Sequence, residues 1–189
     1  MRHVGTKVFE TERLICRPFQ DGDGADMFIN WASDPDIQFE YGEPVYSTAE
    51  QVGGLLKKYI EGYKNPDFYR WAIIKKSSGE NIGQIAFCKV WSDCKTAEVE
   101  YCIGRRFWGK SYAGEDLGGL ISHAFKETDF FKLEAYHRAE NTKSGRVLEK
   151  SAMRVTDTVE RFIRENISPH NEVCYCITRD MYMSDKTII

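Results

Sequence analysis

The chain contains no long hydrophobic run, since nowhere do about 18 apolar residues follow one another. Its opening, MRHVGTKVFE, has no apolar segment of the signal-peptide type. Internal repeats, a linker and low-complexity segments are also missing. These absences argue against a membrane-spanning or secreted protein. We therefore expect a soluble, cytoplasmic protein without a membrane partner.

Metal-binding spacings are missing as well. The four histidines show no HxxxH or HExxH spacing, and no two of the six cysteines form a CxxC pair. Each cysteine lies in or beside a strand-like segment, which favours buried free thiols over disulfides or metal ligands. We therefore expect no metal site. The cysteines are Cys16, Cys88, Cys94, Cys102, Cys174 and Cys176.

Positive charge is neither in excess nor clustered. The chain has 26 Lys and Arg residues against 29 Asp and Glu residues, which gives a net charge of −3 at pH 7. A nucleic-acid surface needs a basic stripe with stacked aromatic residues. The dinucleotide-binding pattern GxGxxG is also missing. We therefore expect no nucleic-acid partner.

The composition that remains is that of one globular domain. The chain has 189 residues, of which 42% are hydrophobic and 13% aromatic. A chain of this size buries roughly 70% of the surface that it exposes when unfolded, which is enough for a sizeable core. We expect one domain over residues 8–183, with elements in the order β, α, α, β, β, β, α, β, α, β, β. The residues alone predict an α+β or α/β fold with a mixed sheet.

The predicted elements follow from hydrophobic periodicity and turn residues. Four helices are expected: one that ends near Asp34-Pro35, one after the capping box at 47–50, one through Leu117 and Phe125, and one that Asn141 begins. The predicted strands are 11–18, 68–75, 82–90, 96–103, 132–138, 155–164 and 173–183.

Aromatic residues gather near the first helix. Trp31 lies on its apolar side, and Phe39 and Tyr41 follow in a segment that we expect to be a loop. These three side chains either pack in the core and a lid or form the wall of a substrate pocket. The sequence leaves both alternatives open.

The stretch from Glu98 to Glu115, EVEYCIGRRFWGKSYAGE, combines a strand, a short loop and the start of an amphipathic helix. The first amides of a helix have no intrahelical acceptor, and the helix dipole places partial positive charge there. Such a turn can hold a phosphate by backbone groups alone. Gly109 lets the backbone come close, while Arg105, Arg106 and Lys110 add positive charge.

This stretch resembles a known family. The residues RFWGKS resemble the R/Q-x-x-G-x-G/A pyrophosphate loop of the GNAT N-acetyltransferase superfamily. The wider run AEVEYCIGRRFWGKSYAGE is similar to the AEIGYWI…WGKGYATEA block of the RimJ/RimL-type branch. The segment TERLICRP resembles the opening of that branch, and NTKSGRVLEK resembles its N-x-x-S-x-R-V-L-E-K segment.

The resemblance implies a fold and a cofactor. The fold would be a mostly antiparallel sheet of about seven strands with about four helices, in which two central strands splay apart to admit coenzyme A. The cofactor would be acetyl-CoA. The residues that the resemblance places against it are Cys102, Ile103, Arg106, Trp108, Gly109, Lys110, Ser111, Tyr112, Ala113, Asn141 and Ser144.

Acetyl transfer to an amine needs a base, and the chain offers three carboxylates. Glu98 and Glu100 lie on one face of the same predicted strand because side chains alternate with a period of two. Like charges so close would raise the pKa of one of them. Glu98 stands where the family has its glutamate, and Glu100 where a glycine is usual. Glu134, on the next strand, is a third candidate or a substrate contact.

The proton donor for the departing thiolate follows from the resemblance. Many GNAT enzymes place a tyrosine seven residues after the motif asparagine, but this position is Leu148 here. Members of the RimJ/RimL-type branch use the serine three residues after the asparagine, which is Ser144. Alternatively, Ser144 only satisfies a backbone amide in the first turn of its helix. Asn141 can cap this helix and bind the cofactor at once.

Three positions depart from the family pattern. Ser111 replaces the second loop glycine, so either its φ stays below zero or the loop shifts slightly. Cys102 replaces a usual tryptophan, and packing is the expected role of its thiol. Ala152 and Met153 replace the Gly-Phe pair that ends the second motif.

Together the motifs predict an acetyl-CoA-dependent N-acetyltransferase. The acceptor would be a primary amine, either a protein N-terminus or a small molecule, that attacks the thioester directly in a ternary complex. The alternative is a non-catalytic acyl-CoA-binding sensor. The sequence does not fix the oligomeric state and leaves a homodimer open.

Overall fold

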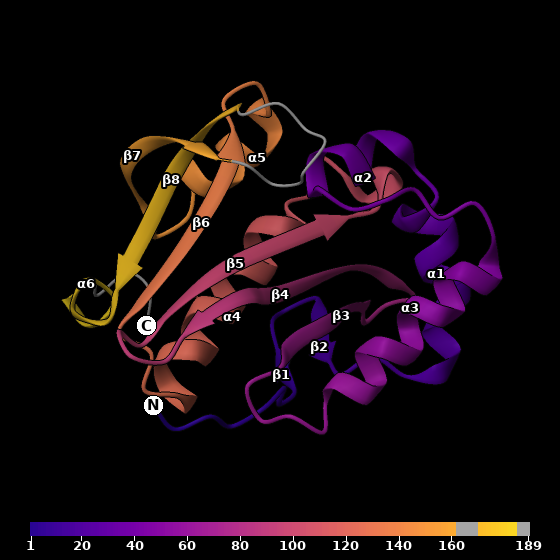
Figure 1. The fold of residues 1–189 in the computed structure, drawn as a ribbon, viewed down its shortest axis with the longest axis horizontal. Helices are drawn as coiled ribbons and strands as arrows, with labels where there is room; N and C mark the ends of the chain where they lie inside the picture. The colour runs from indigo at the N-terminus through magenta and orange to yellow at the C-terminus, as the bar shows by residue number, and fades with distance from the viewer. Residues whose placement is uncertain (162–169, 185–189) are drawn as a thin grey trace.

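The computed structural model describes residues 1–161 and 170–184 (Figure 1). These residues contain eight strands and six α-helices. The strands are β1 (Phe9–Glu10), β2 (Leu14–Arg17), β3 (Tyr69–Lys75), β4 (Asn81–Trp91), β5 (Thr96–Ile103), β6 (Lys132–Arg138), β7 (Arg154–Arg161) and β8 (His170–Thr178). The helices are α1 (Gly24–Met27), α2 (Pro35–Tyr41), α3 (Ala49–Gly62), α4 (Tyr112–Glu127), α5 (Thr142–Glu149) and α6 (Arg179–Ser184). None of these helices is both long and apolar enough to span a bilayer.

The eight strands form one mixed sheet in the order β1-β2-β3-β4-β5-β6-β8-β7. Neighbouring strands are antiparallel except β5 and β6, which are parallel. The predicted mixed, mostly antiparallel sheet is therefore confirmed. It has one strand more than the seven predicted, because β1 contains only Phe9 and Glu10 and is too short to show an alternating pattern.

The segment around Phe39 and Tyr41 is a helix, so the predicted loop is wrong. Helix α2 begins at Pro35, and the Asp34 carboxylate caps it by accepting hydrogen bonds from the amides of Asp36 and Ile37. It ends at Gly42, whose φ of 74° is left-handed. Proline at the first helical position and glycine at the end are ordinary helix boundaries.

The last predicted strand is also too long. Strand β8 ends at Thr178, and α6 follows where the pattern predicts strand up to residue 183. Arg179 fixes this turn because its guanidinium donates to the carbonyls of Phe125, Thr128 and Phe130. Residues 162–164 of the other predicted strand lie outside the described residues.

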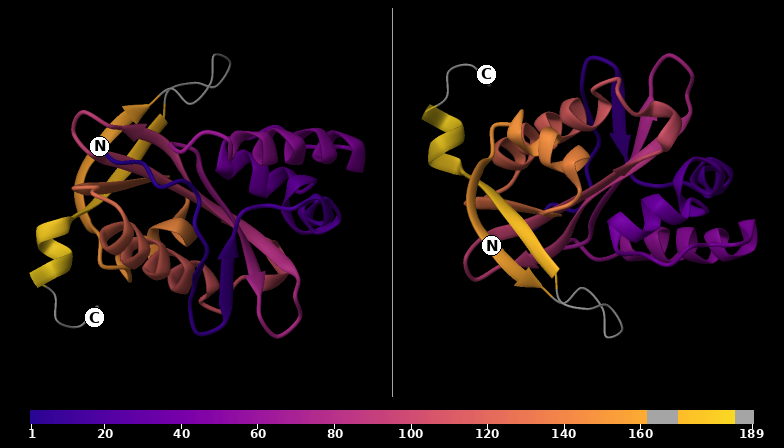
Figure 2. Two further views of the ribbon diagram at one scale, coloured as in Figure 1. Left: turned by 90° about the horizontal axis from the view of Figure 1, so that it is seen from below. Right: turned by 90° about the horizontal axis from the view of Figure 1, so that it is seen from above.

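Helices cover both faces of the sheet, with α1, α2 and α3 on one side and α4 and α5 on the other (Figure 2). The side chains of strand β3 pack into a hydrophobic core on each face of the sheet. Trp71 and Ile73 pack in the core that includes α4, whereas Ala72 and Ile74 pack in the core that includes α3. Trp31 is 1% exposed and belongs to this second core, as the core-packing alternative requires.

The parallel strands β5 and β6 separate along their length. Their pairing runs from Thr96 opposite Lys132 to Val99 opposite Ala135. Beyond this point β5 continues to Ile103, paired only with β4, and β6 continues to Arg138, paired only with β8. The sheet therefore opens between two central strands, as the resemblance implies.

Candidate active site

The turn between β5 and α4 leaves its backbone accessible. Gly109 has a φ of 73°, and a Cβ atom at Gly109 or at Gly114 would meet no other atom within 4 Å. Helix α4 begins at Tyr112 without a side-chain cap, so its first-turn amides lack intrahelical acceptors. This open backbone turn fits a diphosphate.

Ser111, the N-cap of α4, is also left-handed, with a φ of 63°. Of the two alternatives, a φ below zero is therefore wrong. The serine adopts the conformation that glycine provides in the family pattern, although non-glycine residues rarely occupy this region.

Two of the loop cations face carboxylates and not the turn. Arg105 donates through Nε and Nη2 to the two oxygens of Asp34, at 2.8 Å each. Arg106 donates through Nε to Asn30 Oδ1 at 2.9 Å and forms an ion pair with Glu80. Their charges are therefore partly compensated. Lys110 differs, because its ammonium donates to the Arg106 carbonyl at 3.1 Å.

Trp108 connects the loop to the opposite side of the opening. Its indole N–H donates to the carbonyl of Ile103 at 2.7 Å. The Lys143 ammonium, at the start of α5, lies 4.0 Å from the centroid of its ring. A cation held over an aromatic face is attracted by it. The loop after β5 and the helix after β6 are thus in contact.

Asn141 and Ser144 lie together at the start of α5. The Asn141 side-chain oxygen accepts the Ser144 amide at 3.1 Å, and its Nδ2 donates to Glu40 of α2 at 2.9 Å. Ser144 is half-buried, and its carbonyl accepts from the Tyr101 hydroxyl at 3.5 Å. The Ser144 side chain also interacts with the Tyr101 hydroxyl. Leu148 is fully buried in the core.

Two of the predicted carboxylates lie on adjacent strands. Glu98 of β5 and Glu134 of β6 are partners in the parallel register, one position before the last pair. Lys89 lies 3.3 Å from Glu98, and Lys132 lies 2.6 Å from Glu134. Tyr136 also donates to Glu134 at 3.0 Å. Each acid therefore has a cation beside it.

Glu100 forms part of a separate network. Its Oε1 accepts from the Tyr41 hydroxyl at 2.7 Å and from Arg70 at 2.6 Å. Arg70 also donates to Tyr41 and Gln84 and stacks on the ring of Tyr59. Burial, together with the charge of Glu100, raises the pKa of Tyr41, so this hydroxyl stays protonated. The network ties α2 to the sheet.

Cys102 and Phe39 occupy opposite environments. Cys102 is 6% exposed, and burial raises the pKa of its thiol to about 12, which agrees with packing and not with a thiolate. Phe39 is 57% exposed, and its ring lies 4.4 Å from the Arg138 guanidinium carbon. The pattern of residues gives no role to Arg70 or Arg138, although Arg70 is a charged residue beside the apolar run of its strand.

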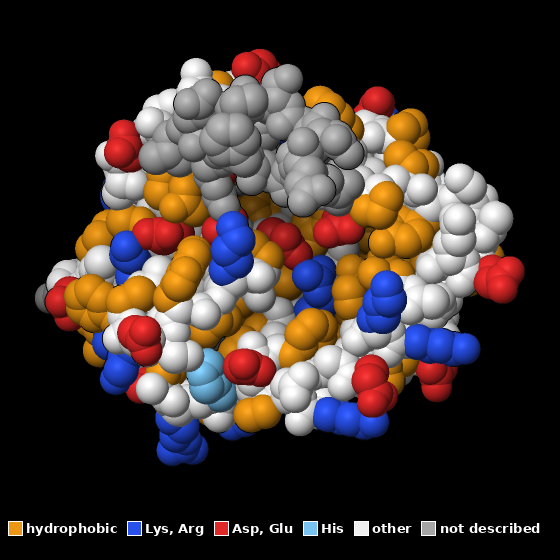
Figure 3. All heavy atoms as spheres, in the orientation of Figure 1, with side chains coloured by type: hydrophobic (Ala, Val, Ile, Leu, Met, Phe, Trp, Pro, Cys, Tyr) orange, Lys and Arg blue, Asp and Glu red, His pale blue; other side chains and the backbone are white. Residues whose placement is uncertain are grey.

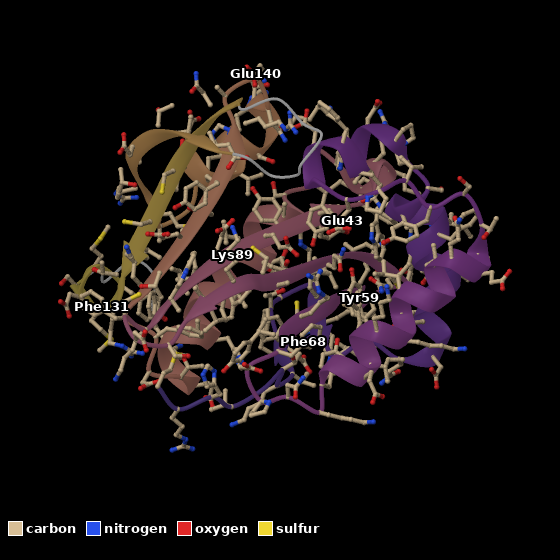
Figure 4. All side chains as sticks on the ribbon, viewed as in Figure 1. Glu43, Tyr59, Phe68, Lys89, Phe131 and Glu140 are labelled. Atoms are coloured by element: carbon tan, nitrogen blue, oxygen red, sulfur yellow. The ribbon has the colours of Figure 1, made fainter. Side chains whose placement is uncertain are left out.

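Charged side chains gather on the sheet face that α2 and α3 flank. Figure 3 shows acidic and basic groups side by side at the centre of this face. In Figure 4, Lys89 and Glu43 lie over the central strands and Tyr59 lies beside them, all on the same face. A hollow of about 400 Å³ elsewhere, between β1 and α4, includes none of the predicted site residues. The opening between β5 and β6 is therefore the candidate site.

The described residues contain no group of three or more His, Cys, Asp or Glu side chains that could hold a metal ion. All six cysteines are free, but Cys88 and Cys94 are exposed, so the expectation of burial is wrong for these two. Cys88 is the extra residue where the pairing of β4 with β5 shifts register.

Comparisons with known proteins agree with this geometry. Residues 13–154 match the family model "Acetyltransferase (GNAT) domain". An uncharacterized N-acetyltransferase, p20 of Bacillus licheniformis, is 30% identical and covers 73% of this chain and 77% of its own. The uncharacterized N-acetyltransferase YoaA of Bacillus subtilis is 24% identical, over 91% of this chain and 97% of its own.

Solved structures share the fold. A GNAT-family acetyltransferase from Bacillus anthracis superposes with a TM-score of 0.80 at 25% identity, covering 92% of this chain and 99% of its own. RimL, a ribosomal L7/L12 acetyltransferase, superposes with a TM-score of 0.78 at 15% identity, covering 91% of this chain and 94% of its own. MccE, in complex with acetyl-CoA and AMP, superposes with a TM-score of 0.77 at 13% identity, covering 88% of this chain and 93% of its own.

GNAT acetyltransferases use acetyl-CoA and act on amine acceptors. The matched model covers the strands that separate, the open turn before α4 and the cap of α5. The chain therefore belongs to the GNAT family of acetyltransferases.

Proposed function

We propose that this chain transfers an acetyl group from acetyl-CoA to a primary amine by direct attack in a ternary complex, within a single domain over residues 8–183. The carrying observation is that β5 and β6 separate after Val99 and Ala135, beside the uncapped start of α4. The end of this opening next to α4 would hold the diphosphate. The strands that border the opening carry the acids Glu98, Glu100 and Glu134. No side chain is needed as a covalent intermediate.

The backbone turn and α5 would hold the carrier. The first-turn amides of α4 would donate to the diphosphate, the space beside Gly109 would admit it, and the Lys110 ammonium would add charge. The carrier supplies the acetyl thioester when bound. Asn141 and Ser144, at the opposite side of the opening, would contact its pantetheine arm. The Ser144 hydroxyl would give its proton to the departing thiolate.

The three carboxylates would have different roles in the reaction. We assign the general base to Glu98, because it lies one position before the strands separate. Glu100 would act as a positioning residue, since a single one of its oxygens accepts from both Arg70 and Tyr41. Phe39, Tyr41 and Glu134 would face the acceptor on the same side of the sheet.

Two measurements test this function. Calorimetry would show acetyl-CoA binding, and thiol release across a panel of primary amines and N-terminal peptides would show turnover. No binding at several hundred micromolar acetyl-CoA would contradict the proposal. Binding without thiol release would favour the sensor alternative.

A further inference from the structure

Arg138, the last residue of β6, has an unusual guanidinium. Its Nε and Nη2 atoms are buried, and neither has a hydrogen-bond partner among the described residues. The guanidinium contacts Phe39 of α2, whose ring centroid lies 4.4 Å from the guanidinium carbon. An aromatic ring attracts the flat face of a cation but does not satisfy the N–H groups at its edge.

Other arginines of this chain donate from a pair of N–H groups to a carboxylate, and Arg105 uses the same edge as the one left open in Arg138. Arg105 donates through Nε and Nη2 to both oxygens of Asp34, and Arg17 donates through Nη1 and Nη2 to both oxygens of Asp23. This fork matches a carboxylate, which accepts two parallel hydrogen bonds from it. Buried N–H groups without acceptors are rare and costly, so they need an explanation such as a ligand.

The location of Arg138 indicates which ligand would supply the acceptor oxygens. Alternation along β6 places it on the same face as Glu134 and Tyr136, whereas Leu133 and Ala135 are in the opposite core. It lies beyond the last residues that pair β5 with β6. Phe39, which covers the flat face of its guanidinium, belongs to α2, the helix that carries Tyr41 to Glu100.

Charge around Arg138 does not replace such a ligand. Glu172 of β8 is the register partner of Arg138 and is buried, so it contributes a countercharge. The Nε and Nη2 protons nevertheless remain without acceptors. What these two N–H groups lack is a pair of acceptor oxygens at one edge of the guanidinium, and a nearby negative charge alone does not supply them.

We propose that Arg138 binds a carboxylate of the acceptor, so that the substrate class is an amine that also carries a carboxylate. This inference rests on the proposed acetyl transfer. Arg138 lies three residues beyond Ala135, which corresponds to about 10 Å along the strand. An extended tripeptide spans about the same length between its amine and its terminal carboxylate.

The test compares tri-alanine with tri-alanine amide, which share the amine and differ in the terminal carboxylate. Acetylated product is measured by mass spectrometry, and kcat/KM is obtained for each peptide. Wild-type protein is expected to prefer the free acid by about 10- to 100-fold, as two charge-assisted hydrogen bonds allow. Di-alanine and tetra-alanine pairs, with the same two end groups, test the spacing and should show a smaller preference.

Variants assign the preference to Arg138. Arg138→Gln should bring the ratio close to 1, mainly through loss of activity toward the free acid, and Arg138→Lys should retain only part of it. Arg2→Gln, a control at an exposed arginine near the N-terminus, should keep the wild-type ratio. A purely structural role would lower kcat/KM for acid and amide alike and leave the ratio unchanged.

The possible outcomes distinguish a failure of this inference from a failure of the proposed acetyl transfer. If wild-type protein shows a ratio of kcat/KM for acid over amide near 1 at every peptide length, the role of Arg138 is overturned. The role is also overturned if the protein acetylates only amines that lack a carboxylate. Either result leaves the acetyltransferase proposal standing. The same holds if Arg138→Gln keeps the preference. No acetyl transfer to any amine overturns both.

Discussion

Glu98 of β5 and Glu134 of β6 lie directly opposite each other just before their strands separate. Like charges in this position repel, and Lys89 and Lys132 each lie beside one of them. The arrangement keeps two carboxylates at the edge of the opening, where an incoming amine would lose its proton. Because Glu98 is on the strand that leads to the turn proposed to bind the diphosphate, we assign the base to it and not to Glu134.

Glu98→Gln should therefore lower kcat by about 100-fold or more, the usual contribution of a general base. Acetyl-CoA affinity should not change, because the side chain lies away from the turn before α4. Glu134→Gln is the matched control and should lower kcat by less than about 10-fold. Steady-state kinetics with one amine, together with calorimetry, measure both quantities. Equal losses in the two variants would contradict the assignment.

Gly109 offers a test of the proposal that the turn before α4 binds the diphosphate. Gly109→Asp places a negative charge where the diphosphate would bind and should weaken acetyl-CoA binding on the order of 100-fold or more. Gly79 is a close match, since its φ is 70° against 73° for Gly109 and both have open space around a Cβ. Gly79 lies between β3 and β4, far from the turn in sequence.

Gly79→Asp should thus cause a similar loss of stability without a loss of binding. Calorimetry of both variants against wild-type protein measures the affinities, and thermal unfolding measures the stabilities. If both variants bind acetyl-CoA as the wild type does, the diphosphate is held elsewhere.

Local patterns predict the helices and strands around the candidate site where they depend on neighbouring residues. The strand, turn and helix from Thr96 to Glu127 follow from alternation, glycine and an apolar stripe, all within one stretch of chain. Helix α2 was missed although its signals are local, because Asp34-Pro35 was interpreted as the end of one helix and not also as the start of the next. This error does not affect the position of the opening.

Contacts between distant segments could not be predicted in this way. Tyr41 reaches Glu100 across 59 positions in the sequence, and Arg70 reaches it across 30. Alternation alone cannot tell a buried ion pair from a solvated charge. The backbone of Ser111 was undetermined for a similar reason, since its left-handed conformation depends on how the turn meets α4.

Ser144 should act in turnover more than in binding. Ser144→Ala is expected to lower kcat by about 100-fold while acetyl-CoA affinity stays within a few-fold, because its hydroxyl would serve as the proton donor. Ser151→Ala is the control: that hydroxyl donates to the Leu148 carbonyl and accepts from the Met153 amide, so its loss should cost about 1 kcal/mol of stability without lowering kcat. Equal losses of kcat and affinity in Ser144→Ala would make Ser144 a cofactor contact only.

Asp116 of α4 predicts how stability depends on pH. It is fully buried, accepts from the Cys16 thiol at 2.9 Å, and its Oδ2 has no partner in the described chain. Burial raises its pKa from 3.8 to about 7. The folded protein therefore holds a proton that the unfolded chain releases, so the free energy of unfolding should fall as pH rises from about 4 to about 7.

The carboxylate should thus cost stability on the order of 4 kcal/mol at pH 8 relative to pH 4. Asp116→Asn removes the titration and retains an oxygen that can accept from Cys16. Urea unfolding at pH 5 and pH 8 should show a much smaller decrease for this variant than for wild-type protein. Equal decreases for the two proteins would mean that Asp116 does not hold a proton in the folded core, and the pH dependence would then have to arise from other groups.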